Sequence, residues 1–576
     1  MPSLPSRRAF LLSLLTSTAL AALPEASAAA GRTRANIIVV VLDDVGYSDL
    51  GCFGGEIRTP NLDRLAQGGL RYTAFDTKAV CSATRAALLT GRNPHTVNMP
   101  DVPDVAAADP KAYGPDAFHI PRNAENVAQV LQREGYATWL VGKWHLIPMA
   151  QLDPKAGQDT WPLQRGFDYF YGFARGWTDQ YRPDLVENNA YIKPELPSGY
   201  HLSADLIDKS ISLIEANTAD PKAKPFYLHI GLGVAHSPIQ VPARYSDRYK
   251  GVYDNGWDEL RRQRFARMKA MGLIPDFTEL PEPNPGDRAW AELSDDERAV
   301  FARYMEVYAG FIEHADGQIG RLLDRLKARG IERNTLVMVL SDNGAASEAG
   351  QTGYFEALYR PNTLTPAQMR ARIDDLGTDR TQSEYPRPWA GAGVTPFRRY
   401  KLWPYLGGVR TPLIVSWPAR VRDGGAIRRH FLDAVDIAPT LLAAAGTRFP
   451  ATVGGVRQLP VAGRSFESTF DDPRASAVRT TQYFELRGNR AITSGRWRAV
   501  ALHECGKPYE ADRWQLFDLA ADPAEARDVA AAHPATVAQL KLLWAQEWQR
   551  STARPLEQPP ARICAIAQQY DAPAVR

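Results

Sequence analysis

Oxygen-bearing side chains close two apolar runs of this sequence. One run ends in Asp43 and Asp44, and a second ends in Asp342 and Asn343. Their oxygens suit a hard divalent cation such as Ca²⁺ or Mg²⁺, whereas zinc prefers His and Cys ligands. Either pair alone is as typical of a turn or a helix cap as it is of a metal site. Their recurrence at the ends of predicted strands favours a metal site.

Two further apolar runs end in side chains that carry or move protons. Lys143 and His145 close one of them, and His236 closes the other. Burying the Lys143 ammonium beside an apolar strand is costly unless an anion lies against it. A site that only binds a ligand needs no proton shuttle, so the two histidines favour catalysis over binding alone.

The stretch KAVCSATRAALLTGR, residues 78–92, places three residues between Cys81 and Arg85. Residues 82–89 predict a helix, whose N-terminal N–H groups and dipole attract an anion, and Arg85 lies one turn into it. A phosphatase-type thiolate would need a longer anion-binding loop before its arginine. An isolated cysteine is best explained as a small buried side chain. The position of Cys81 ahead of this helix favours a functional role.

The elements that must position these side chains are short β-rich apolar runs that alternate with helical patterns. This alternation predicts an α/β fold built on a largely parallel sheet. Ligands bind at the carboxyl ends of the strands in such sheets, where the polar side chains of this sequence gather. Residues 297–329 repeat apolar side chains at the spacing of a packed helix. The four predicted strands with polar ends span residues 36–44, 137–145, 225–237 and 335–344.

Two long segments and the C-terminal region interrupt this pattern. Residues 100–121 and 348–395 are rich in Pro, Asp, Gly and Thr, which predicts surface loops that border the site. Near the C-terminus, short strand-like pieces precede one helical segment, which predicts a small antiparallel sheet with a helix on one face. A turn-like stretch around Phe449 marks the boundary, giving a catalytic domain at 35–449 and a C-terminal α+β subdomain at 450–576.

The composition points to a small-molecule partner. Among 576 residues, 68 Lys and Arg oppose 65 Asp and Glu, for a net charge of +3. The basic residues are scattered along the chain, which argues against a nucleic-acid or membrane surface.

The N-terminus has the pattern of an export signal. Arg7 and Arg8 precede an apolar run and then small residues, which resembles a twin-arginine signal and places the signal peptide at 1–28. An ordinary secretory signal with two chance arginines is the alternative. Both predict a periplasmic or secreted protein that needs no membrane once the signal is removed. Cys505 and Cys564 form a candidate disulfide in that oxidising compartment.

Taken together, these motifs resemble the type I sulfatases, and most closely the bacterial arylsulfatases. In that family a CxPxR or CxAxR motif carries a cysteine that is oxidised to Cα-formylglycine, and Cys81-Ser82-Ala83-Thr84-Arg85 matches it. The resemblance implies an alkaline-phosphatase-like fold with a large mixed, mostly parallel sheet flanked by helices. A smaller C-terminal domain with an antiparallel sheet and a helix would follow. The other matching stretches are VLDDVGYSDLGCFGG, TPNLDRLAQGGL, GYATWLVGKWHL, RGFDYFYGF, LSDNGA, YKLWPYLGGVRTPLIVSWP and LFDLAADPAEARDV.

The resemblance also implies a role for each matching residue. The metal ligands would be Asp43, Asp44, modified Cys81, Asp342 and Asn343, around one cation that is Ca²⁺ in preference to Mg²⁺. Arg85 and His145 would bind the formylglycine hydrate, and His145 would later take a proton from it. Lys143 and Lys401 would neutralise the sulfate oxygens. His236, assisted by Lys401, would protonate the departing alcohol or phenol.

The implied reaction is hydrolysis of aryl or alkyl sulfate esters, after a formylglycine-generating enzyme has matured Cys81. A phosphoester or phosphonate monoester hydrolase on the same site is the alternative, because the same charges stabilise a phosphoryl transition state. A non-catalytic binding protein with unconverted Cys81 is a third. Ala83 stands where most aerobic members have proline, which leaves the completeness of the modification open. The candidate pocket walls are Trp177, Tyr181, Trp389 and Trp403.

Overall fold

The structure is a computed structural model that describes residues 34–108, 113, 116–360 and 362–565. The predicted signal peptide at 1–28 lies outside the described residues. The described residues, from Arg34 onward, form one compact unit. No helix in the described ranges combines the length and the apolarity needed to cross a membrane.

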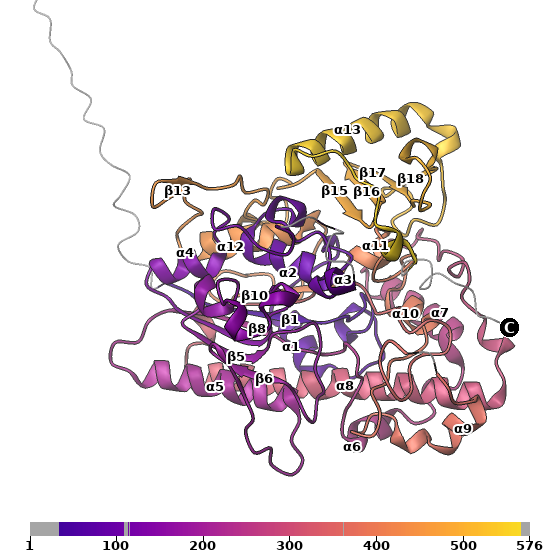
Figure 1. Cartoon of the computed structure of the whole chain (residues 1–576), viewed down its shortest axis with the longest axis horizontal. Helices are drawn as coiled ribbons and strands as arrows, with labels where there is room; N and C mark the ends of the chain where they lie inside the picture. The colour runs from indigo at the N-terminus through magenta and orange to yellow at the C-terminus, as the bar shows by residue number, and fades with distance from the viewer. Residues whose placement is uncertain (1–33, 109–112, 114–115, 361, 566–576) are drawn as a thin grey trace, which may run out of the picture. The chain divides into compact units, whose positions relative to one another are not determined.

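A ten-stranded mixed sheet forms the centre of this unit (Figure 1). Its five central strands, β9, β1, β8, β4 and β5, run parallel, and antiparallel strands extend it on both sides. The predicted fold class is therefore confirmed. In spatial order the strands are β11 (Ile427–Arg428), β2 (Leu70–Tyr72), β10 (Leu413–Ser416), β9 (Thr335–Ser341), β1 (Asn36–Leu42), β8 (Phe226–Gly231), β4 (Ala137–Lys143), β5 (Tyr169–Phe173), β6 (Leu185–Glu187) and β7 (Ala190–Ile192).

The sequence of strand β1 is almost entirely apolar because both faces of the strand are buried. Ile38, Val40 and Leu42 pack into one hydrophobic cluster, and Ile37 and Val39 pack into another on the opposite face. Because successive side chains of a strand point to opposite faces, a strand covered on both sides has no position for a polar residue. Polar side chains appear only where the strand ends.

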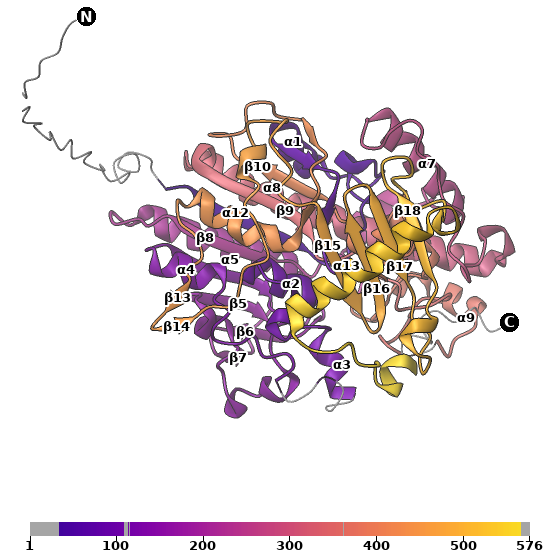
Figure 2. The ribbon, with the colours of Figure 1, turned by 90° about the horizontal axis from the view of Figure 1, so that it is seen from above.

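Helices cover both faces of the sheet (Figures 1 and 2). On one face lie α1 (Pro60–Gly68), α5 (Leu202–Ala219) and α8 (Asp295–Ala328), which share a hydrophobic cluster with one side of β1. On the other lie α2 (Cys81–Thr90), α4 (Val127–Arg133) and α12 (Ile437–Ala444). The helix predicted at 297–329 is α8, which begins with a capping box between Ser294 and Glu297.

The segments predicted as loops contain short helices. Residues 100–121 include α3 (Pro103–Ala108), and residues 348–395 include α9 (Pro366–Ala371) and α10 (Pro388–Gly393). The other helices are α6 (Ala243–Ser246), α7 (Gly256–Ala270) and α11 (Leu406–Val409), and the two small two-stranded sheets are β3 (Phe75–Asp76) with β12 (Leu432–Asp433) and β13 (Thr452–Val453) with β14 (Val456–Arg457).

The C-terminal region forms the predicted antiparallel sheet and helix. The four strands are β15 (Thr481–Leu486), β16 (Asn489–Ser494), β17 (Trp497–Ala501) and β18 (Trp514–Asp518), paired in sequence order. Helix α13 (Pro534–Thr552) packs on this sheet through Leu540 and Trp544. The domain boundary near Phe449 stays a prediction.

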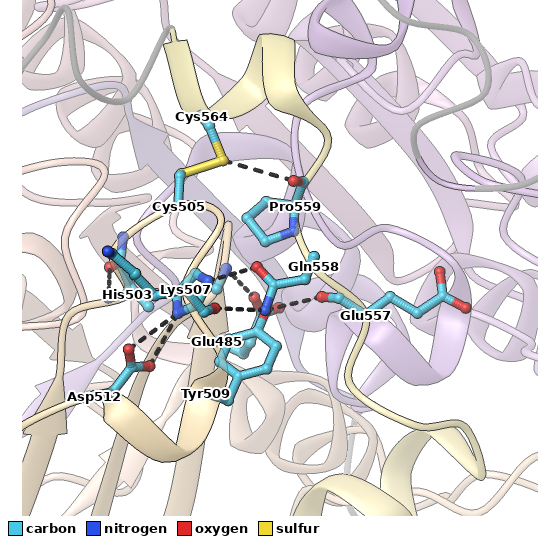
Figure 3. The surroundings of a disulfide bond; sticks show 12 residues. Glu485, His503, Cys505, Lys507, Tyr509, Asp512, Glu557, Gln558, Pro559 and Cys564 are labelled. Atoms are coloured by element: carbon cyan, nitrogen blue, oxygen red, sulfur yellow. Dashed lines mark hydrogen bonds and ion pairs between the residues drawn. A yellow bond between two sulfur atoms is a disulfide. The ribbon is translucent and has the colours of Figure 1, made fainter.

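A disulfide joins Cys505 to Cys564 (Figure 3). It ties the segment after α13 to the loop between β17 and β18. Gln558 reinforces the same junction, since its side chain contacts His503 at 2.7 Å and donates to the Lys507 carbonyl at 3.0 Å. The candidate pairing of these two cysteines is therefore present in the structure.

Candidate active site

The carboxyl ends of four adjacent strands, β9, β1, β8 and β4, meet at one edge of the sheet. Asp43 and Asp44 follow β1, and Asp342 follows β9. Lys143 is the last residue of β4, and His236 lies a few residues after β8. The parallel pairing of Leu42 with Ser341 puts the next residues of the two strands beside each other. The sheet topology thus brings these predicted site residues together.

Cys81 is the first residue of α2, and its side chain is buried. Its Sγ lies 3.3 Å from His145 Nδ1. Candidate ligand atoms of Cys81, Asp43 and Asp342 all lie within 4.8 Å of one another. Burial raises the pKa of the Cys81 thiol to about 12, although Lys143 and Lys401 oppose this. An unmodified Cys81 in this setting is a thiol near neutral pH, and a thiol is a poor nucleophile.

Lys143 and Arg85 each lie against a carboxylate. Lys143 Nζ donates to Asp43 Oδ2 at 2.7 Å. Arg85 donates to Asp342 Oδ2 through Nε at 3.0 Å and Nη2 at 2.7 Å. Burial alone would lower the pKa of Lys143, but the Asp43 carboxylate raises it above its usual value. These pairs keep both cations charged inside the protein.

Lys401 lies between two carboxylates. Its Nζ is 2.9 Å from Asp44 Oδ2 and 2.7 Å from Glu348 Oε1. Burial would lower the pKa of Lys401, but the Asp44 and Glu348 carboxylates raise it well above its usual value. Lys401 therefore stays an ammonium, and it belongs to a loop far in sequence from the other cations of the site.

His236 is held by its backbone neighbour and faces Asp44. Its Nδ1 lies 2.6 Å from the carbonyl oxygen of Ser237, so Nδ1 carries a proton and donates it there. Its Nε2 lies 3.7 Å from Asp44 Oδ2. The Ser237 hydroxyl in turn donates to Glu384 Oε2 at 3.1 Å. Burial, and then the Glu348 charge, raises the pKa of Glu384 well above its usual value, which favours the neutral form of Glu384.

His145 contacts a residue that no sequence motif indicated. Its Nδ1 faces Cys81, and its Nε2 lies 2.7 Å from Asp104 Oδ2 in helix α3. Burial would raise the pKa of Asp104, but the hydrogen bond and charge of His145 lower it to about 2. Asp104 is therefore an ionised acceptor, and the bond requires a proton on His145 Nε2.

Two buried oxygens at the strand ends accept no hydrogen bond from any described residue. They are Asp43 Oδ1 and Asn343 Oδ1. A buried oxygen without a partner is costly, and a cation is one way to satisfy it. The Asn343 amide nitrogen donates to Asp44 Oδ1 at 2.6 Å, which leaves its oxygen as the free atom. This donor set of carboxylate and amide oxygens fits a hard divalent cation.

The aromatic residues predicted as pocket walls differ in position. Trp389 is buried against Trp257 and Trp290 and donates to the Phe301 carbonyl, so its prediction as a pocket wall is wrong. Its indole fills the core beside α7, where no substrate reaches it. Trp177, by contrast, packs on the small cluster of Ala349, Tyr354 and Leu358, which begins one residue after Glu348.

Three carboxylates of the site were missed as individual residues. Asp104 lies in the segment 100–121, and Glu348 and Glu384 lie in 348–395. Both segments are predicted to border the site, so any acidic residue within either segment is a candidate for the site. Nothing in the sequence distinguishes these acids from the others in the same segments.

Family models match nearly the whole described chain. A model described as sulfatase matches residues 35–447. A second model, described as N-sulphoglucosamine sulphohydrolase, C-terminal, matches residues 399–549. The two matches overlap around Lys401 and together include every residue of the site.

Individual relatives agree with these models. An uncharacterised sulfatase of Schizosaccharomyces pombe is 32% identical over 534 residues, covering 89% of this chain and 93% of the relative. An arylsulfatase of Klebsiella aerogenes is 32% identical over 477 residues, covering 80% of this chain and 96% of the relative. The crystal structure of Ps i-CgsB in complex with k-i-k-neocarrahexaose shares the fold, with a TM-score of 0.61, 21% identity, and coverage of 94% of this chain and 98% of that one.

Proposed function

The chain belongs to the sulfatase family, and we propose that it acts through a formylglycine made from Cys81 and through one divalent cation, Ca²⁺ in preference to Mg²⁺. It is a sulfuric ester hydrolase. The observation that carries the proposal is the position of Cys81 at the start of α2, buried among Asp43, Asp342 and His145.

The chemistry of Cys81 supports its conversion. As a buried thiol with a raised pKa it is a poor nucleophile, and a sulfate ester on an ordinary Ser or Cys has no internal route of release. A formylglycine hydrate supplies both a nucleophilic hydroxyl and a second hydroxyl through which sulfate leaves. We therefore assign the maturation of Cys81 to a formylglycine-generating enzyme, which is the one protein partner that the proposal requires.

The cation is proposed to bind Asp43, Asp44, Asp342, Asn343 and residue 81. The orphaned oxygens of Asp43 and Asn343 support this assignment. When bound, such a cation neutralises sulfate charge and lowers the pKa of a hydroxyl on residue 81. Roughly six or more oxygen ligands would distinguish Ca²⁺ from zinc.

The remaining side chains divide between the nucleophile and the leaving group. Arg85, which lies one turn after residue 81 in α2, and His145, which contacts residue 81, are proposed to orient its hydroxyl groups. Lys143 and Lys401, which are paired with Asp43 and Asp44, are proposed to neutralise sulfate oxygens. His236 Nε2, which faces away from the Ser237 carbonyl, is the proposed acid for the departing oxygen, with Lys401 assisting. Protonation of a leaving group at this step is typically worth about 10²–10⁴-fold in rate.

The substrate is proposed to be an aryl or alkyl sulfate ester, which includes sulfated sugars. The arylsulfatase relative supports the first class, and the fold neighbour solved with a neocarrahexaose supports testing the last. We also propose that the chain is exported, through the twin-arginine route, to the periplasm or beyond. The Cys505–Cys564 disulfide suits an oxidising compartment.

The test compares matched esters on purified mature protein. A nitrophenyl sulfate, an alkyl sulfate, a nitrophenyl phosphate and a phenyl phosphonate are assayed at equal concentrations, with Cys81→Ala as the control for contaminating enzymes. We expect the highest kcat/KM on a sulfate ester and none in the control. A larger kcat/KM on the phosphate or phosphonate would favour the phosphoester or phosphonate hydrolase on the same site. No turnover of any ester would favour a binding protein with unconverted Cys81.

A further inference from the structure

We propose that Asp104 is a positioning residue that holds His145 in one tautomer, so that the lone pair of His145 Nδ1 faces residue 81. Asp104 Oδ2 lies 2.7 Å from His145 Nε2, and His145 Nδ1 lies 3.3 Å from Cys81 Sγ. The three groups form a carboxylate, imidazole and nucleophile series of the kind that hydrolases use to orient a base. The inference rests on the proposed function, because the proposed formylglycine hydrate is what gives residue 81 a hydroxyl.

The backbone and ring of His145 are fixed from several directions. His145 has a φ of 56°, in the left-handed region that is uncommon for a side-chain-bearing residue. The Ser82 hydroxyl donates to its carbonyl at 2.8 Å, and its N–H donates to the Ala174 carbonyl at 3.2 Å. A Cβ on Gly176 would lie 2.7 Å from the ring, so glycine there lets the chain pass close to the imidazole. These contacts place the ring but do not choose its tautomer.

Asp104 determines the tautomer of His145. An ionised carboxylate only accepts hydrogen bonds, so the proton of the neutral imidazole must be on Nε2. The opposite tautomer would point an N–H at residue 81 and leave two acceptors, Nε2 and the carboxylate, facing each other. Asp104 thus acts on residue 81 through His145, without contacting the substrate sulfate.

The consequence concerns the step that releases sulfate. As the C=O bond of residue 81 reforms and its bond to the sulfate oxygen breaks, the remaining hydroxyl loses a proton. That proton goes to His145 Nδ1, while Nε2 keeps its own proton in the bond to Asp104. His145 would then be an imidazolium whose Nε2–H still donates to the Asp104 carboxylate, and it would later return the proton to water.

The first measurement reads the tautomer directly. Protein labelled with ¹⁵N-histidine, carrying Ca²⁺ and formylglycine, is examined by long-range ¹H–¹⁵N correlation, and His145→Gln identifies the signal among the ten histidines. We expect a protonated Nε2 and an unprotonated Nδ1 in the wild type. In Asp104→Ala, and in Asp104→Asn, we expect the Nδ1–H tautomer to become populated. An unchanged Nε2–H signal in Asp104→Ala would overturn the proposal.

The second measurement separates the two halves of turnover. With a nitrophenyl sulfate, phenol and sulfate release are followed independently after rapid mixing. We expect Asp104→Ala to lower kcat by about 10–100-fold, while the first equivalent of phenol still appears in a burst. Asp104→Glu should recover part of the lost kcat. Loss of the burst together with kcat would assign Asp104 to the integrity of the site and contradict its proposed role.

Asp101→Asn is the matched control. Asp101 lies three residues earlier, just before α3, is buried, and anchors the same segment through Arg487 and Tyr113. If loosening of this segment were the cause, Asp101→Asn would reproduce the tautomer change, and that result would refute the proposal. A wild-type protein that carries formylglycine at residue 81 but has no sulfatase turnover would instead refute the proposed function, since the tautomer measurement is independent of turnover.

Discussion

At the scale of single residues, the site is a set of buried charges that neutralise one another. Lys143 lies on Asp43, Arg85 on Asp342, and Lys401 on both Asp44 and Glu348. Removing one member of a buried pair typically costs about 3–5 kcal/mol, because it leaves a charge without a partner. Substitutions of these residues therefore change stability as well as activity, and kinetic comparisons between substrates are more informative than losses on one substrate.

Such a comparison tests the role of His236. A nitrophenolate leaves without a proton, whereas an alkoxide needs one. His236→Ala should therefore lower kcat/KM for an alkyl sulfate more than for a nitrophenyl sulfate, by a differential within about 10²–10⁴-fold. Arg85→Ala is the control and should lower both about equally, because the proposed role of Arg85 is to hold the nucleophile, whatever the leaving group. Equal losses for His236→Ala would assign His236 to sulfate binding and the acid role to Lys401.

Residue by residue, the sequence predicts the site unevenly. Asp43, Asp342 and Lys143 were predictable because each ends an apolar strand, where a polar side chain stands out. Lys401 was indicated only by resemblance, since its loop has no periodicity. Asp104 and Glu384 were not predictable as individuals, because they reach the site through loop conformations that the local sequence does not determine.

At the scale of elements, the candidate metal site depends on the pairing of two strands. Strands β1 and β9 are parallel neighbours in register, and the Asp342 N–H donates to the Leu42 carbonyl at 3.1 Å just beyond them. Asp43 and Asp342 therefore meet without help from any loop. A cation at this junction cross-links the two central strands, so it should stabilise the folded protein.

Calcium is expected to raise the thermal midpoint of the purified protein. A ligand at 100 times its Kd stabilises a fold by about 2.7 kcal/mol. Asp43→Asn with Asp342→Asn should abolish the calcium response, whereas Asp433→Asn, which breaks the buried pair with Lys78, should destabilise the protein and keep that response. Scanning calorimetry with and without Ca²⁺ measures both. Stoichiometric zinc by elemental analysis, or metal retained by the double variant, would contradict the assignment.

The junction of α5 and α8 should make stability depend on pH. His201, at the N-terminus of α5, and His314 of α8 lie with ring centroids 4.2 Å apart. Burial lowers the pKa of His201 to about 4, and burial together with the nearby His201 lowers that of His314 to about 2. Both folded-state values lie below the unfolded value of about 6.5, so below that pH the unfolded state binds more protons.

The free energy of unfolding should accordingly fall as the pH drops from 6.5 to 4. Each buried histidine contributes up to about 1.4 kcal/mol per pH unit in this window. His314→Gln removes one such contribution, so the variant should lose less stability than the wild type between pH 7 and pH 5. Urea unfolding at the two pH values gives the difference. Identical losses in both proteins would show that His314 is protonated in the folded state.

At the scale of the whole molecule, the fold was largely predictable and its connections were not. Strands β1 and β9 are buried on both faces, so their sequences are continuous apolar runs that predict buried strands. The amphipathic spacing of α8 predicts that helix. The antiparallel additions β10, β6 and β7 carry no comparable signal, because they are short, and β10 also pairs with β2 and β9, which lie far away from it in sequence. Pairing over long distances is set by tertiary packing.

The Cys505–Cys564 disulfide joins two residues that are 59 apart in sequence, and the loop that it closes contains β18 and α13. Cross-links over such loops stabilise a fold by about 2–4 kcal/mol through the entropy of the unfolded chain. Replacing both cysteines by serine should lower the free energy of unfolding by this amount and leave kcat/KM on a nitrophenyl sulfate unchanged, because the bond lies in the C-terminal region. A loss of activity in the folded double variant would connect this region to catalysis.

The central claim, that residue 81 of the active enzyme is a formylglycine, is tested most directly by mass spectrometry of the peptide that spans residues 79–85. Preparations that differ in sulfatase activity are digested, and the aldehyde-containing fraction of this peptide is measured in each. The account predicts that kcat per enzyme rises in proportion to that fraction and reaches zero with it. A preparation with full turnover whose peptide contains only the free thiol would contradict it.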